Sequence, residues 1–136
     1  VQGLVSFYGV FGADMNTDSH RRYATGYGFT SARMADLFAL YDPEGRRHTE
    51  PCICPLAASD AQLHALPPAL LLAAELDVLS DDTRALAARL GALGLPHALH
   101  IEPGVTHGFI NRGRLVPAAN ASLARAARFI CNLDLT

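Results

Sequence analysis

The stretch ALLLAAELDVLSDD, residues 69–82, decides the fold class. It begins with an unbroken apolar run over residues 69–74, a pattern typical of a strand that is covered on both faces in a parallel sheet. Asp77 follows the expected end of this strand, and polar residues come next. The stretch therefore predicts a buried parallel strand that leads through a short turn into a helix.

The helix after this strand has clear start and stop signals. Ser80 offers an N-cap. Gly94, followed by Pro96, ends the helix. Between them, leucines recur at helical spacing and predict the buried face: Leu86, Leu90 and Leu93.

Strand and helix patterns also flank this unit. Residues 4–8 are apolar and aromatic, as in a buried strand, and residues 97–102 alternate, as in a half-exposed strand near a sheet edge. A helical excursion at about 12–68 separates the first two strands. Within it we expect helices near 19–23, from Thr30 or Ser31 to Tyr41, and near 60–64. A last helix over about 116–133 should bury the apolar positions Leu123, Ala127 and Ile130.

This order predicts one α/β domain over residues 1–136, with about three parallel strands and flanking helices. A sheet of only three parallel strands leaves a long edge and much apolar surface unpaired. We therefore expect further strands from a preceding portion or from a partner chain.

Composition narrows the class of protein. The chain has 136 residues, of which 50% are hydrophobic and 18% charged, and its formal net charge is −2. These values indicate a packed globular domain and argue against a nucleic-acid-binding or membrane surface. No apolar run approaches the ~20 residues of a membrane span, and the start lacks the pattern of a signal peptide. We expect a cytoplasmic protein.

The three cysteines, Cys52, Cys54 and Cys131, form an odd count that fits a reducing compartment. His48, Cys52 and Cys54 could be read as metal ligands. A structural zinc site commonly takes four ligands from two paired knuckles, and a second knuckle is missing. We therefore predict neither a metal nor an organic cofactor.

Asp77 and His107 are the candidate catalytic residues. Each follows a predicted parallel strand, and reactive groups collect just past the carboxyl ends of such strands. If the two strands are neighbours, ~4.8 Å apart, the carboxylate and the imidazole can meet. The aspartate would accept from one ring nitrogen and leave the other as a base. A turn-capping aspartate and an unrelated histidine are the alternative.

Other polar and aromatic residues have weaker interpretations. Tyr8 and Phe109 could line a substrate pocket, although aromatic residues at strand ends are often plain core. Ser80, Asp81 and Asp82 are best explained by helix capping and the helix dipole.

Three motifs carry a resemblance to a known family: Leu-Pro-Pro-Ala at 66–69, Ala-Glu-Leu-Asp-Val-Leu-Ser-Asp-Asp at 74–82, and Gly-Val-Thr-His-Gly-Phe at 104–109. Together they resemble the C-terminal part of an α/β-hydrolase of the hormone-sensitive-lipase-like carboxylesterases, of the bacterial acetyl esterase kind. In that family the first two motifs carry the acid of a catalytic triad and the third carries its histidine. The resemblance implies these roles for Asp77 and His107, respectively.

The resemblance also implies a serine carboxylesterase that hydrolyses small acyl esters. The family's nucleophile lies in a Gly-x-Ser-x-Gly elbow and its oxyanion hole in a His-Gly-Gly-Gly loop, and neither motif occurs here. We therefore expect the serine in a preceding portion or a partner chain, and negligible activity from these residues alone. Family resemblance further suggests a homodimer through residues 97–102 and 116–133.

Two alternatives remain at this stage. The chain could be a non-catalytic interaction module that pairs through its exposed sheet edge. It could also be a nucleotide- or phosphate-binding protein of flavodoxin type, although no glycine-rich turn joins a strand to a helix.

Overall fold

Three parallel strands form the central sheet of the computed structural model, which describes residues 1–133. They are β1 (Leu4–Phe7), β2 (Ala69–Leu76) and β3 (His97–Thr106), in the order β1-β2-β3. Residues 69–74 of β2 are all buried because the strand lies in the middle of the sheet. The prediction of three parallel strands is confirmed. β2 and β3 each extend further than the apolar patterns indicate.

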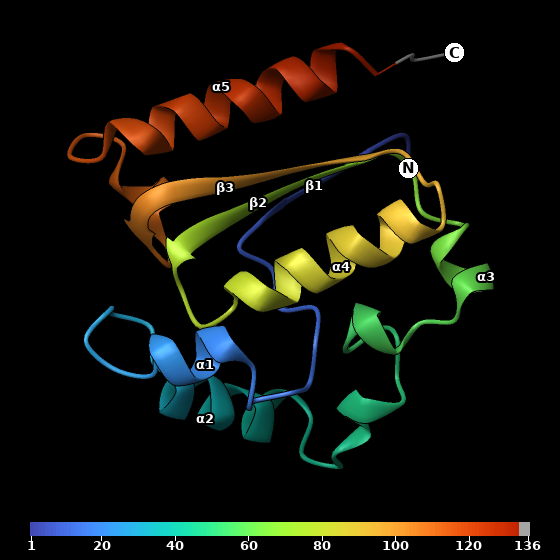
Figure 1. The fold of residues 1–136 in the computed structure, drawn as a ribbon, viewed down its shortest axis with the longest axis vertical. Coiled ribbons are helices and arrows are strands. Elements are labelled where there is room, and N and C mark those ends of the chain that lie inside the picture. Colours follow the sequence, from blue (N-terminus) through green and yellow to red (C-terminus); the bar gives the residue numbers. More distant parts are fainter. Residues whose placement is uncertain (134–136) are drawn as a thin grey trace.

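Helices cover the two faces of this sheet. Figure 1 shows α4 (Ser80–Ala92) on one face and α5 (Pro117–Cys131) on the other. Alternate residues of β2 point to the two faces of the sheet. Leu71 packs with Leu86 and Leu90 of α4, as predicted, whereas Leu70 and Leu72 pack against the face that α5 covers.

The predicted buried face of α5 is wrong. The buried positions are Ala119, Ser122 and Ala126, while Leu123 and Ile130 are 45% and 53% exposed. Most large side chains at this contact come from outside the helix, because Ala126 packs with leucines of β2 and Ala119 packs with Phe109. Small residues let the helix approach closely. Leu123 and Ile130 therefore stay exposed, whereas Phe129 packs toward the sheet.

The predicted N-cap of α4 is also wrong. Ser80 is the first residue of the helix, and Leu79 occupies the N-cap position without a side-chain hydrogen bond. The turn is closed instead by the backbone, where the Ser80 N–H donates to the Asp77 carbonyl at 3.1 Å.

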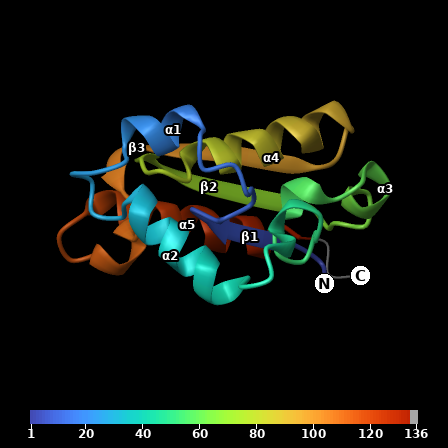
Figure 2. The same ribbon diagram turned by 90° about the horizontal axis from the view of Figure 1, so that it is seen from below.

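The excursion contains α1 (Asp18–Arg22), α2 (Ser31–Tyr41) and α3 (Asp60–Leu63), near the predicted positions, with short 3₁₀ turns at 46–48 and 55–57. Hydroxyl groups cap all three α-helices, from Thr17, Thr30 and Ser59. Figures 1 and 2 show α1 and α2 near the start of α4, at the carboxyl end of the sheet. The excursion thus lies where the candidate catalytic residues are expected.

None of the helices in the described part of the chain reaches the length and apolarity that a membrane span requires. Cys54 is buried, whereas Cys52 and Cys131 are exposed, and all three are free thiols. Within residues 1–133, no group of three or more His, Cys, Asp or Glu side chains is arranged to hold a metal ion.

Candidate active site

Asp77 and His107 meet at the carboxyl end of the sheet, because β2 and β3 are neighbours and deliver their following loops to the same edge. His107 Nδ1 lies 2.8 Å from Asp77 Oδ2. The Asp77 side chain is only 1% exposed, whereas that of His107 is 26% exposed. The ionised carboxylate can only accept, so Nδ1 carries the proton and Nε2 keeps a free lone pair.

The Asp77 carboxylate is held by its own turn as well. The Leu79 N–H donates to Asp77 Oδ1 at 3.1 Å, so each carboxylate oxygen has one partner. This arrangement fixes the direction in which the carboxylate faces the imidazole.

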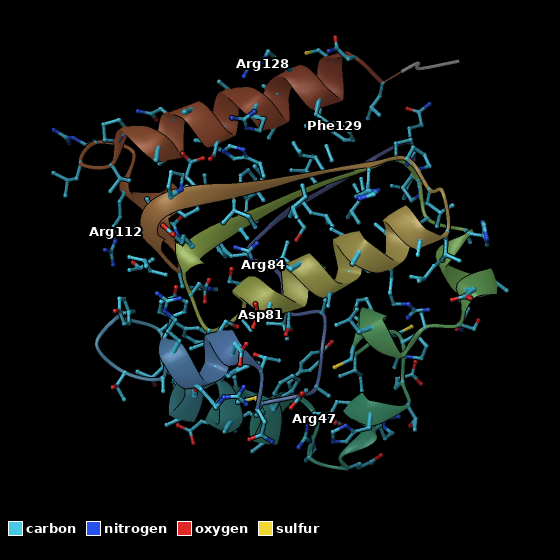
Figure 3. All side chains as sticks on the ribbon, in the orientation of Figure 1. Arg47, Asp81, Arg84, Arg112, Arg128 and Phe129 are labelled. Atoms are coloured by element: carbon cyan, nitrogen blue, oxygen red, sulfur yellow. The ribbon has the colours of Figure 1, made fainter. Side chains whose placement is uncertain are left out.

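Asp81 ties the turn after β2 to α1. Its Oδ2 accepts from the Ser19 N–H at 2.8 Å, and Ser19 Oγ donates to the Val78 carbonyl at 2.6 Å. Figure 3 shows Asp81 at the start of α4, on the side of α1. Asp81 lies in the first turn of α4, as predicted, but it does not cap that helix, because its carboxylate bonds α1.

Asp82 ties the same turn to the segment after β1. Its Oδ2 accepts from the N–H groups of Phe11 and Gly12 at 3.0 and 2.8 Å. Burial raises the pKa of the Asp82 carboxyl, although these two N–H groups act in the opposite direction. Asp82 also lies in the first turn of α4, as predicted, but it bonds the segment after β1 and does not cap the helix.

Two aromatic rings contact the His107 imidazole. The Tyr8 ring centroid lies 4.5 Å from it at a tilt of 56°, and the Phe29 ring is stacked on it at 4.5 Å and 28°. Tyr8 has φ of +42°, and no other non-glycine residue in the described range has a positive φ. Such backbone strain persists where the surroundings enforce it, often at functional sites. Burial, together with the nearby Asp77 charge, raises the pKa of Tyr8.

A cavity of about 730 Å³ opens beside His107. Most of its lining comes from the excursion and is apolar: Val10, Phe29, Met34, Leu37, Phe38, Leu40, Tyr41, Cys52, Ile53, Pro55 and Leu79. The sequence pattern on α2 predicts a helix with a buried face. Met34 and Phe38 are buried, while Leu40 and Tyr41 remain exposed near the cavity.

The predicted pocket residues lie near the histidine, but not in the lining of this cavity. Tyr8 contacts His107 directly. Phe109 is 2% exposed and packs with Ala74 and Ala119 in the core, 5.8 Å from the Tyr8 ring. Phe29 lines the cavity and was missed, because nothing in the local pattern of a glycine-rich loop predicts its position.

All six serines lie in the described range, and none hydrogen-bonds to His107. Four of them have other polar partners: Ser19 bonds Val78, Ser31 bonds His20, Ser59 caps α3 and Ser122 bonds Glu102. His107 Nε2 has no hydrogen-bond partner within residues 1–133.

Comparison with known proteins identifies relatives over most of the chain. It is 33% identical over 119 residues to an ethyl acetate hydrolase of Pseudomonas putida, covering 88% of this chain and 37% of that protein. It is 36% identical over 86 residues to the hormone-sensitive lipase of Bos taurus, covering 61% of this chain and 11% of that protein.

Solved structures of esterases are also similar to this chain. A thermostable esterase from Pseudomonas putida superposes with a TM-score of 0.90 at 30% identity, over 98% of this chain and 43% of that chain. An esterase from Rhizomucor miehei superposes with a TM-score of 0.91 at 30% identity, over 98% of this chain and 41% of that chain. The chain thus spans well under half the length of these relatives.

A family model described as the alpha/beta hydrolase fold matches residues 1–111. The match covers all three strands together with Asp77 and His107, and it excludes the flavodoxin-type alternative. The chain therefore belongs to the α/β-hydrolase fold family, and its relatives include esterases and lipases.

Proposed function

We propose that this chain supplies the acid and the histidine of a serine carboxylesterase that acts on small acyl esters. The observation that carries the proposal is the 2.8 Å contact between His107 Nδ1 and the buried Asp77 carboxylate, beside an apolar cavity. The esterase relatives support the reaction class.

In the proposed reaction, His107 Nε2 accepts the proton of a serine hydroxyl while the serine oxygen attacks the ester carbonyl. The imidazolium then gives this proton to the leaving alcohol, and an acyl-enzyme remains. In the second half, His107 accepts a proton from water, whose oxygen attacks the acyl carbon. The proton returns to the serine, and the carboxylic acid leaves.

Asp77 remains ionised throughout this cycle. It fixes the tautomer that has the proton on Nδ1, and it stabilises the imidazolium as it forms. Burial of the Asp77 carboxylate strengthens this interaction, because it limits the screening of the 2.8 Å contact by water.

The cavity supports an uncharged, apolar group on the substrate. Apart from His107, its polar side chains are Cys52 and Tyr41, and no lining residue is an aspartate, glutamate, lysine or arginine. A charged acyl or alcohol group would lose its hydration there without gaining a partner. We therefore propose neutral esters as the substrate class.

The nucleophilic serine in this proposal comes from polypeptide outside these 136 residues. None of the serines has the elbow context, and none contacts His107. On this account the 136 residues alone have negligible activity, because the oxyanion donors are also missing. The competing reading is an interaction module that pairs through the sheet edge and catalyses nothing.

The test is hydrolysis of short-chain aryl esters by the protein that contains this chain, with and without the substitution His107→Ala. We expect kcat to fall by about 10⁴-fold or more in the variant while its melting temperature changes little. His64→Ala is the matched control, because His64 is exposed at the end of α3. Near-normal activity in His107→Ala, or an inactive wild type, would contradict the proposal.

A further inference from the structure

The loop between α1 and α2 carries an aromatic ring onto the proposed catalytic histidine. The Ser31 N–H donates to the Ala24 carbonyl at 3.2 Å and closes the loop, while Ser31 Oγ donates to the His20 carbonyl at 2.7 Å. The end of the loop at Ser31 is thereby fixed to α1 and to the start of the loop. Phe29, in this loop, brings the loop against His107 in the segment that follows β3.

Two glycines give the loop its shape. Gly26 and Gly28 have φ of +87° and +91°, a region that L-residues rarely adopt. A Cβ atom at either position would meet nothing within 4 Å, so the backbone conformation, and not a lack of space, requires glycine. Between them, the Tyr27 ring packs edge-on against Tyr23 at 5.0 Å.

Phe29 comes directly after these glycines and links the histidine to the core. Its ring is stacked on the His107 imidazole at 4.5 Å and 28°, and it also packs against the cluster that contains Met34 and Val78. A stacked apolar ring restricts rotation of the imidazole and keeps water from the adjacent face. The negative face of an aromatic ring also favours a neighbouring cation, here the imidazolium.

We propose that Phe29 is a positioning residue for His107. It holds the imidazole so that Nδ1 stays bonded to Asp77 while the ring lines the same cavity as Phe29. The proposal rests on the function proposed above, since it gives His107 the role of base. The His107 imidazole makes only one hydrogen bond to the described residues. Its aromatic contacts with Tyr8 and Phe29 therefore supply the remaining restraint on its rotation.

The test is proton NMR of the protein with ¹⁵N-labelled histidine, following the His107 Nδ1 proton and its exchange with water. We expect Phe29→Ala to accelerate exchange by about two- to tenfold, the size expected for the loss of one aromatic contact. Phe29→Tyr keeps the ring and should retain the wild-type exchange rate. This signal reports the imidazole directly.

A second variant keeps the ring and moves it. Gly28→Ala strains the loop and should displace Phe29 from His107, with the same faster exchange as Phe29→Ala. The control is Gly94→Ala, which introduces comparable strain, since Gly94 also has a positive φ (+66°) and open space. It lies at the end of α4, at the amino end of β3, and should leave the signal unchanged.

Unchanged exchange in both Phe29→Ala and Gly28→Ala would overturn the role of Phe29 and leave the proposed function standing. Equal acceleration by Gly94→Ala would overturn it as well, because strain alone would then explain the effect. A wild type with no Nδ1 proton bonded to Asp77 would instead contradict the pairing itself, and with it both proposals.

Discussion

The two loops that meet at the site are held in different ways. The turn after β2 is buried, and its carboxylates are tied to α1 and to the segment after β1 by hydrogen bonds. His107, after β3, is partly exposed and has one hydrogen bond and two aromatic contacts. In the proposed function the acid transfers no proton and can be rigid, whereas the base exchanges protons with the serine, the leaving alcohol and water. Aromatic contacts restrain its ring without occupying Nε2.

The largest expected effect comes from breaking the link between the loops. In Asp77→Asn, the amide can donate to the ring and stabilise the wrong tautomer, with the proton on Nε2. We expect kcat for ester hydrolysis to fall by about 10⁴-fold with the fold intact. The exposed Asp18 gives the matched control, Asp18→Asn. Activity within tenfold of wild type would contradict the role of Asp77.

The next test breaks the rigid loop itself. Asp82→Ala leaves the buried N–H groups of Phe11 and Gly12 without their acceptor. We expect the free energy of unfolding, from urea titration, to fall by about 2–5 kcal/mol. Asp36→Ala, at an exposed position of α2, should change it by less than about 0.5 kcal/mol. Equal stability of the two variants would show that the hydrogen bonds from Phe11 and Gly12 to Asp82 contribute little to the stability of the fold.

A smaller effect concerns pH. Burial raises the pKa of Asp82 above 3.8, so from that pH upward the folded state binds more protons than the unfolded state. The contribution of this group to stability is therefore present at low pH and is lost as pH rises through the raised pKa. Melting curves from pH 4 to 7 should show the stability of the wild type falling relative to Asp82→Asn. A stability difference between the two proteins that does not change with pH would contradict the raised pKa of Asp82.

The smallest effect on the site should come from a region outside both loops. Leu123 and Ile130 are exposed on α5, the helix that we expect at a homodimer interface. The double variant Leu123→Asp, Ile130→Asp should lower the mass from light scattering from dimer to monomer. The free energy of unfolding should change by less than about 0.5 kcal/mol per substituted site. A wild type that is already monomeric would contradict the dimer, which stays a prediction.

Much of this fold could be predicted from the sequence, because its signals are local. The apolar run of β2 and the leucines of α4 have the periods of the elements that they form. The rule about the carboxyl ends of parallel strands predicted that Asp77 and His107 could meet if their strands were neighbours, and the family resemblance implied their roles.

The features that the sequence did not predict correctly share one cause. The buried face of α5 depends on large side chains from β2 and Phe109, which no periodicity within the helix reveals. Asp81 and Asp82 have the composition of a helix start, yet their partners lie 62 to 71 positions away. Phe29 likewise reaches His107 only through the loop conformation. Local sequence patterns do not predict contacts between residues that are far apart in the sequence.

The central claim is that His107, oriented by Asp77, activates a serine. The most direct measurement is intact mass spectrometry of the protein that contains this chain after reaction with a serine-directed fluorophosphonate, in the wild type and in His107→Ala. The account predicts one label per wild-type protein and labelling at least about 10³-fold slower in the variant. Equal labelling rates, or an unlabelled wild type that contains a serine elbow, would contradict it.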